Sequence, residues 1–168
     1  MMKAGAQDYI MKDNMARLLP AIERELSDAQ IRRDHKLSEK IQKVLYNISN
    51  AVVSTENLND LMIVIRYELG SLVDTTNFYI AFYDEKTGML TSPYGEDKMD
   101  QLSSWPAKGS LTGLVVSQNK PILTTKDKTL EMNRSGEVEL IGTTAECWLG
   151  VPLREGDRVT GALSLIHI

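Results

Sequence analysis

The sequence is poor in features that mark several common classes of protein. Its single cysteine, Cys147, cannot form an internal disulfide, which favours a reducing compartment such as the cytoplasm. The longest aliphatic run covers residues 61–65 and is far shorter than the ~20 residues that span a bilayer. The net charge is −4, and Lys and Arg are not concentrated beside aromatics as on a phosphate-binding surface. We therefore expect a cytoplasmic protein without membrane contact from this segment and without a nucleic-acid partner.

The composition otherwise describes a folded protein. Apolar residues make up 42% and charged residues 25% of the 168 positions, which suits one domain with an attached segment. Two histidines and one cysteine, widely separated, do not have the spacing of a metal-ligand set. We expect neither a metal nor another cofactor.

The first third of the chain has helical periodicity. From Pro20 to about Val53 apolar residues recur three or four positions apart, which predicts one long helix or two helices nearly in line. Proline is well placed at a first helical position, so we expect the start at Pro20. Residues 31–36, which are nearly all charged, interrupt the apolar stripe and suggest a solvated connector. A second helix follows from about residue 58, with Ser54 or Thr55 available as its N-cap.

The rest of the chain alternates between strands and short helices. Residues 77–84 place Phe78, Ile80 and Phe82 on one face of a strand that we expect to be central. The other expected elements are strands over residues 89–92, 121–125, 147–153 and 158–165, a helix capped by Ser110, and a weak helical turn at 130–133. Together they predict an α+β fold. We expect an antiparallel sheet with helices on one face, a pocket side of loops and a short helix on the other, and a long N-terminal helix before it.

Several motifs resemble those of GAF domains. Residues 148–153 (Trp-Leu-Gly-Val-Pro-Leu) and 156–163 (Gly-Asp-Arg-Val-Thr-Gly-Ala-Leu) are similar to the closing hairpin of that family. Residues 110–122 and 136–142 match two further motifs in the expected order. The resemblance covers about residues 40–163. It implies a GAF domain of a bacterial-type two-component sensor protein, a sensor histidine kinase or a hybrid.

The N-terminal residues resemble the end of a response-regulator receiver domain. Residues 4–14 are similar to its last strand, and Lys12 stands where that family has the lysine that pairs with a phosphorylated aspartate. The acceptor aspartate and the magnesium-binding acidic pair do not precede it, so we interpret Lys12 as a relic. The expected organisation is a receiver remnant at 1–33, a linker or signalling helix at 34–53 and a GAF domain at 40–168, truncated at its C-terminal end.

A ligand pocket would be lined by apolar walls with a few polar tips. The residues that we predict to line it are Tyr79, Ala81, Tyr83, Trp105, Leu111, Leu114, Thr124 and Trp148. The same aromatics could simply fill a small core, because the sequence does not tell which sheet face each strand presents. Residues 108–110 precede a helix whose N-terminal amides could accept an anion, with a plain capped helix as the simpler interpretation.

Candidates for catalysis are few. His35 lies on a helix but is followed by Lys36 and Leu37, unlike the phosphoacceptor motif of sensor kinases, and we interpret it as a solvated residue. Cys147 has no histidine near it in sequence to lower its pKa, and GAF-fold methionine sulfoxide reductases use more than one cysteine. We expect Cys147 to be a small buried strand residue and the domain not to be an enzyme.

Three hypotheses follow. The first is a non-catalytic sensory module of a phosphorelay protein, which binds a small ligand and signals through a homodimer formed by the N-terminal helix. The second is a ligand-free dimerisation or spacer domain with a filled core. The third is an enzyme that uses Cys147 as a reactive thiol. A cavity beside the sheet would favour the first over the second.

Overall fold

The computed structural model describes residues 17–96, 103–140 and 144–167. The chain forms two compact units with their boundary between Tyr46 and Asn47. Lys12 and the receiver-like residues around it lie outside the described residues. None of the helices in the described ranges combines the length and the hydropathy needed to cross a membrane.

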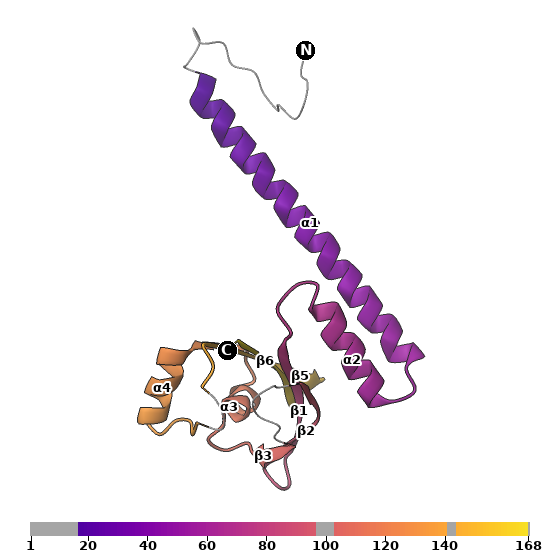
Figure 1. Ribbon diagram of the computed structural model, residues 1–168, viewed down its shortest axis with the longest axis vertical. Coiled ribbons are helices and arrows are strands. Elements are labelled where there is room, and N and C mark those ends of the chain that lie inside the picture. The colour runs from indigo at the N-terminus through magenta and orange to yellow at the C-terminus, as the bar shows by residue number, and fades with distance from the viewer. Residues whose placement is uncertain (1–16, 97–102, 141–143, 168) are drawn as a thin grey trace. The chain divides into compact units, whose positions relative to one another are not determined.

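The first unit consists of most of one long helix, α1, Leu18–Ser54 (Figure 1). The helix begins two residues before the predicted start, which Pro20 tolerates because the first four N–H groups of a helix have no intrahelical acceptor. It continues through residues 31–36, so the predicted polar gap does not interrupt it. Five of its exposed apolar side chains lie along one side of the helix, and we call them the α1 stripe: Leu19, Ile22, Leu26, Leu37 and Ile41.

The second unit is an α+β domain built on a six-stranded antiparallel sheet, as predicted (Figure 1). Across the sheet the strands follow the order β3-β2-β1-β6-β5-β4. The strands are β1 Asn77–Asp84, β2 Met89–Glu96, β3 Ser104–Pro106, β4 Ile122–Thr125, β5 Cys147–Glu155 and β6 Arg158–His167. The helices are the end of α1 from Asn47, α2 Leu58–Leu69, α3 Leu111–Gln118 and α4 Lys126–Arg134.

The two faces of the sheet pack against different helices. Phe78 and Ile80 are buried with Met62 of α2 on one face, together with leucines of β5 and β6. On the other face, Val115 of α3 is buried against Ala162 of β6. Because neighbouring residues of a strand point to opposite faces, the register of β1 and β6 decides which side chains meet α3.

Three local predictions need correction. The N-cap of α2 is Asn57, whose Oδ1 accepts the N–H of Asp60 at 2.9 Å, while Thr55 instead donates its hydroxyl to the carbonyl of Ala51. The helical turn predicted at 130–133 is longer and forms α4. Residues 96–108 have no periodicity in sequence, which predicts a loop, but strand β3 forms within them; its Trp105 is buried and pairs with Leu90.

Candidate functional site

The face of the sheet that α3 covers, here called the α3 face, collects most of the predicted pocket residues. Tyr79, Ala81 and Tyr83 alternate along β1 with the residues that pack on α2, so they lie on the α3 face. Residues that are directly opposite each other on neighbouring strands lie on the same face, so the pairing shows which residues of the other strands belong to it. The registered pairs on it are Tyr79 with Ser164, Ala81 with Ala162, Leu90 with Trp105, and Thr124 with Trp148.

An aromatic contact occupies one end of the α3 face. The rings of Tyr79 and Trp105 meet edge to face, with centroids 5.6 Å apart and planes at 84°. The Tyr79 hydroxyl lies 2.7 Å from Oγ1 of Thr112, in the first turn of α3. Ala81 is fully buried in the same cluster. These residues therefore contribute mainly to packing between the sheet and α3.

A second cluster joins α3 to the middle of the sheet. Trp148 packs with Val115 and Ala162, and Leu111 lies partly buried against them. The Trp148 ring passes so close to Gly150 that a Cβ there would collide with it. Thr124 is buried, and its hydroxyl lies 3.2 Å from that of Thr129 in α4. Trp148, Leu111 and Thr124 thus belong to the packed part of the α3 face.

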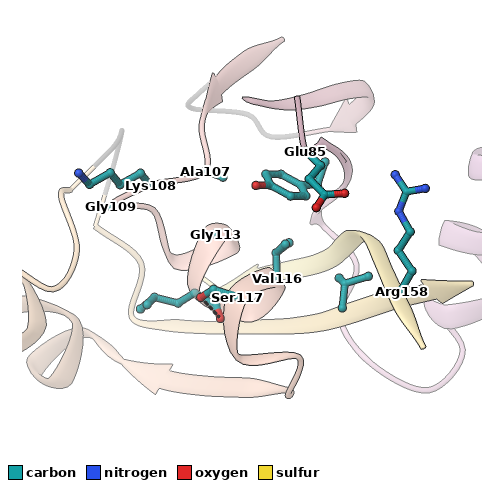
Figure 2. Close-up of a pocket in the computed structure, with 11 residues that line it drawn as sticks. Glu85, Ala107, Lys108, Gly109, Gly113, Val116, Ser117 and Arg158 are labelled. Carbon is teal, nitrogen blue, oxygen red and sulfur yellow. Dashed lines mark hydrogen bonds between the residues drawn. The ribbon is translucent and has the colours of Figure 1, made fainter. Parts of the chain in front are cut away.

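A cavity of about 580 Å³ opens beside α3, where β1 ends and β6 begins (Figure 2). Its volume is within the range of small-molecule sites. The cavity is lined by Tyr83, Glu85, Ala107, Lys108, Gly109, Gly113, Leu114, Val116, Ser117, Arg158 and Val159. We call it the α3 cavity. Of the eight predicted pocket residues, it contains Tyr83 and Leu114.

The α3 cavity has charged side chains at its margin and small or apolar residues on its α3 wall. Lys108 and Arg158 extend from opposite sides, and Glu85 lies between them at the end of β1 in Figure 2. Gly113 and Val116 form part of the α3 wall. The described residues contain no cluster of three or more His, Cys, Asp or Glu side chains able to hold a metal ion.

Helix α3 is held at both ends. At its N-terminus, Ser110 accepts the N–H of Gly113 at 2.9 Å and donates its hydroxyl to the carbonyl of Ala107 at 2.9 Å. At its C-terminus, Arg154 of β5 donates to both the side chain and the backbone carbonyl of Asn119, at 2.7 Å each. Asn119 has a left-handed conformation, φ 52°, which asparagine tolerates better than most residues.

Sequence reasoning missed part of this cavity for a topological reason. Lys108 and Gly109 belong to the segment before a helix for which the sequence allows an anion site. Arg158 and Val159 were assigned only to the closing hairpin, because no local pattern shows that the start of β6 lies beside the end of β1. Glu85 and Ser117 are polar residues of a turn and a helix, and carry no signal in sequence that separates them from ordinary surface residues.

Cys147 lies away from the α3 cavity. It alternates with Trp148 on β5, so it belongs to the opposite face of the sheet, and it is half-buried. His167 of β6 is directly opposite it in register, although 20 residues separate the two along the chain, and Nδ1 of His167 lies 3.7 Å from Asp74. Cys147 therefore has no histidine close to it along the chain, as stated from the sequence, but the sheet places His167 on the strand position opposite it.

Comparison with solved structures assigns the fold. The GAF domain of a phosphoenolpyruvate-protein phosphotransferase from Coxiella burnetii is similar at a TM-score of 0.62 and 17% identity, over 77% of this chain and 78% of that chain. The GAF domain of a two-component sensor histidine kinase from Bacillus halodurans is similar at 0.52 and 16%, over 67% and 78%. The fold is that of GAF domains, as the motifs predicted. No protein-family model matches the sequence, and no curated protein matches it.

One comparison overturns the prediction about catalysis. The free methionine-R-sulfoxide reductase of Neisseria meningitidis, in complex with its substrate, is similar at a TM-score of 0.59 and 14% identity, over 79% of this chain and 75% of that chain. The prediction that the domain is not an enzyme was therefore wrong as an inference from this fold, because the same fold carries a reductase.

Proposed function

We propose that this chain is a sensory or regulatory module that binds a small ligand in the α3 cavity. The observation that carries the proposal is the cavity itself, because one of its walls is the helix α3. A molecule bound there would contact Gly113, Leu114 and Ser117 directly, so its binding could change the position of α3 on the sheet. The presence of a cavity of this size supports sensing over a spacer with a filled core.

The charges at the margin suggest the kind of ligand. Lys108 and Arg158 lie on opposite sides of the α3 cavity, and both are exposed. Exposed ion pairs contribute little affinity each, so they would orient an anionic group more than hold it. Leu114 and Val116 would contact the apolar part of the ligand. We expect a small metabolite with an apolar body and at least one anionic group.

We further propose that the module acts in a two-component signalling protein and that α1 transmits the signal as a homodimer. The sensor-kinase GAF domain among the similar structures supports this context. The α1 stripe supports the dimer, because exposed apolar rows on a long helix suit pairing with a second copy. In this proposal the ligand changes the packing of α3, and the helices carry that change as a small shift.

The ligand proposal can be tested by filling the cavity from its exposed side. Ser117 lines the cavity and is exposed, so Ser117→Trp should fill it without disturbing the core. We expect a screen of anionic and neutral metabolites by thermal shift to find a binder, and calorimetry to show that Ser117→Trp weakens it at least tenfold. Gln118→Trp, one position along the helix and not part of the cavity lining, is the control and should bind normally.

Two results would contradict the proposal. If no member of a broad panel shifts the melting temperature of the wild-type protein, the spacer hypothesis is favoured. If a ligand binds equally well to the wild type and to both tryptophan variants, the molecule binds elsewhere and the α3 cavity is not the sensing site.

A further inference from the structure

The α3 cavity is lined by charged side chains of both signs. They are Glu85, Lys108 and Arg158, and all three are exposed. Among the described residues, no carboxylate lies within ion-pair distance of Lys108 or Arg158, and no donor lies within hydrogen-bond distance of the Glu85 carboxylate. The cavity therefore presents a carboxylate and two cationic groups that are available to a ligand.

The topology of the sheet places Glu85 and Arg158 at the same edge of the cavity. The last registered pair of β1 and β6 is Phe82 with Gly161. Glu85 lies three residues after Phe82 and Arg158 lies three residues before Gly161, so antiparallel pairing brings both to one end of the sheet. Figure 2 shows their side chains next to each other, with Lys108 on the opposite side. A carboxylate and a guanidinium are thus neighbours that do not form an ion pair.

A ligand with negative charge alone would approach a carboxylate at either end of the cavity. At the Arg158 end this carboxylate is that of Glu85. At the Lys108 end the Glu139 side chain lies beside Gly109, 3.6 Å from the position that a Cβ of residue 109 would take. Like charges placed together disfavour binding, whereas a ligand that carries both signs can satisfy both protein groups.

We propose that the α3 cavity selects a zwitterion, whose ammonium group binds Glu85 and whose carboxylate binds Arg158. This inference rests on the proposed ligand site and specifies its ligand. A guanidinium can donate two parallel hydrogen bonds to a carboxylate, and an ammonium group donates to a carboxylate in turn. The apolar part of the ligand contacts Val159 of β6 and Val116 of α3. The ligand class is therefore a small molecule that resembles an α-amino acid with an apolar side chain.

The first test compares matched probes that differ in charge. L-Phenylalanine and L-leucine are zwitterions, phenyllactate and hydroxyisocaproate keep only the carboxylate, and phenethylamine and isoamylamine keep only the ammonium group. In ligand-observed NMR titrations, at least one amino acid should bind about fivefold more tightly than its hydroxy acid and its amine, the upper range for one exposed ion pair. Failure of both amino acids to bind overturns the proposal, as does a hydroxy acid or an amine that binds as tightly as its amino acid.

The second test assigns the ammonium group to Glu85. Glu85→Gln should weaken the amino acid about three- to fivefold and leave its hydroxy acid unchanged or bound more tightly, because a like charge has been removed. Glu155→Gln is the matched control, since Glu155 is opposite Arg158 on β5, is exposed and does not line the cavity. It should bind the amino acid normally. Equal weakening by the two variants would show a general effect of charge near Arg158 and would overturn the contact with Glu85.

Ser117→Trp separates this inference from the ligand site on which it rests. Loss of the amino acid in Ser117→Trp but not in Gln118→Trp supports its binding in the α3 cavity. If a hydroxy acid binds as tightly as its amino acid and both are lost in Ser117→Trp, the ligand site is supported and the zwitterion is wrong. An amino acid that binds equally to the wild type and to Ser117→Trp binds elsewhere, and this overturns its assignment to Glu85 and Arg158.

Discussion

At the scale of single residues, Gly113 sets how closely α3 approaches the loop before it. A Cβ added at this position would collide with the backbone carbonyl of Ala107. The same carbonyl accepts the hydroxyl of Ser110, so this loop is fixed to the start of the helix. Gly113 also lines the α3 cavity, where the lack of a side chain leaves room.

This contact predicts the effect of one added methyl group. Alanine is a better helix former than glycine, so in a free helix Gly113→Ala would stabilise by up to ~1 kcal/mol. Here the collision with backbone should dominate, and we expect a loss of about 1–3 kcal/mol in the free energy of unfolding, measured with urea. The exposed Gln118→Ala on the same helix is the control and should change little. Equal stability of the two variants would show that the loop moves freely away from α3.

Single residues also show which part of the site could be predicted from the sequence and which part could not. The alternation in residues 77–84 predicted that Tyr79, Ala81 and Tyr83 share a face, because that follows from strand geometry alone. Which helix covers the face depends on the pairing of β1 with β6, about 80 residues later in the chain. Local patterns contain no information about such distant register, so Arg158 and Ser117 were not predicted as site residues.

At the scale of elements, the helices and strands with the clearest sequence patterns were predicted most accurately. Strand β1 has the predicted bounds because six consecutive apolar or aromatic residues, 78–83, are flanked by the polar Asn77 and Asp84. Helix α4 was only partly predicted, because it is short and mostly polar. Its contacts are tertiary or at its end: the Thr129 hydroxyl lies 3.2 Å from that of Thr124 in β4, and the Ser135 N–H donates to the carbonyl of Glu131. The predicted bounds of elements were least accurate where tertiary contacts, such as the pairing of β3 with β2, decide the structure.

The turn between β1 and β2 should make this hairpin sensitive to acid. The Thr87 hydroxyl, followed by the Lys86 backbone N–H, lowers the pKa of Asp84 below its ordinary value of 3.8. A carboxylate whose pKa is lower in the folded state stabilises the fold above its unfolded pKa and loses that contribution as the pH falls. We therefore expect the melting temperature to decline below about pH 4, and to decline less in Asp84→Asn.

The comparison of the two proteins isolates this turn from other carboxylates. Asp84→Asn keeps the shape of the side chain but does not titrate. The difference in melting temperature between wild type and variant should be constant at neutral pH and shrink between about pH 4 and pH 2. A difference that stays constant through that range would show that Asp84 has the same pKa in the folded and unfolded states.

At the scale of the whole molecule, the α1 stripe is an exposed apolar row on the described part of the first unit. Leu26 and Leu37 in it are eleven residues apart, a spacing that suits a straight or slightly right-handed helical pair. We predict that Ile41→Glu, which places a charge within the stripe, converts a dimer to a monomer in light scattering. Lys43→Glu, exposed on another side of α1, is the control for added negative charge and should remain dimeric.

The outcome of this experiment distinguishes two roles for α1. Dimerisation that depends on Ile41 supports signal transmission through a helical pair. A wild-type protein with the mass of a monomer would contradict the dimer, and the stripe would then be available to a different partner.

The two ends of α3 differ in burial, and this decides which end can move. The Ser110 end is buried, and Oγ1 of Thr112 in its first turn lies 2.7 Å from the Tyr79 hydroxyl of β1. The Asn119 end is more exposed and is held by two hydrogen bonds from the guanidinium of Arg154, which belongs to the hairpin of β5 and β6. A ligand that displaces the middle of α3 would therefore move the Asn119 end more than the Ser110 end. Through Arg154, that displacement would reach the hairpin of β5 and β6.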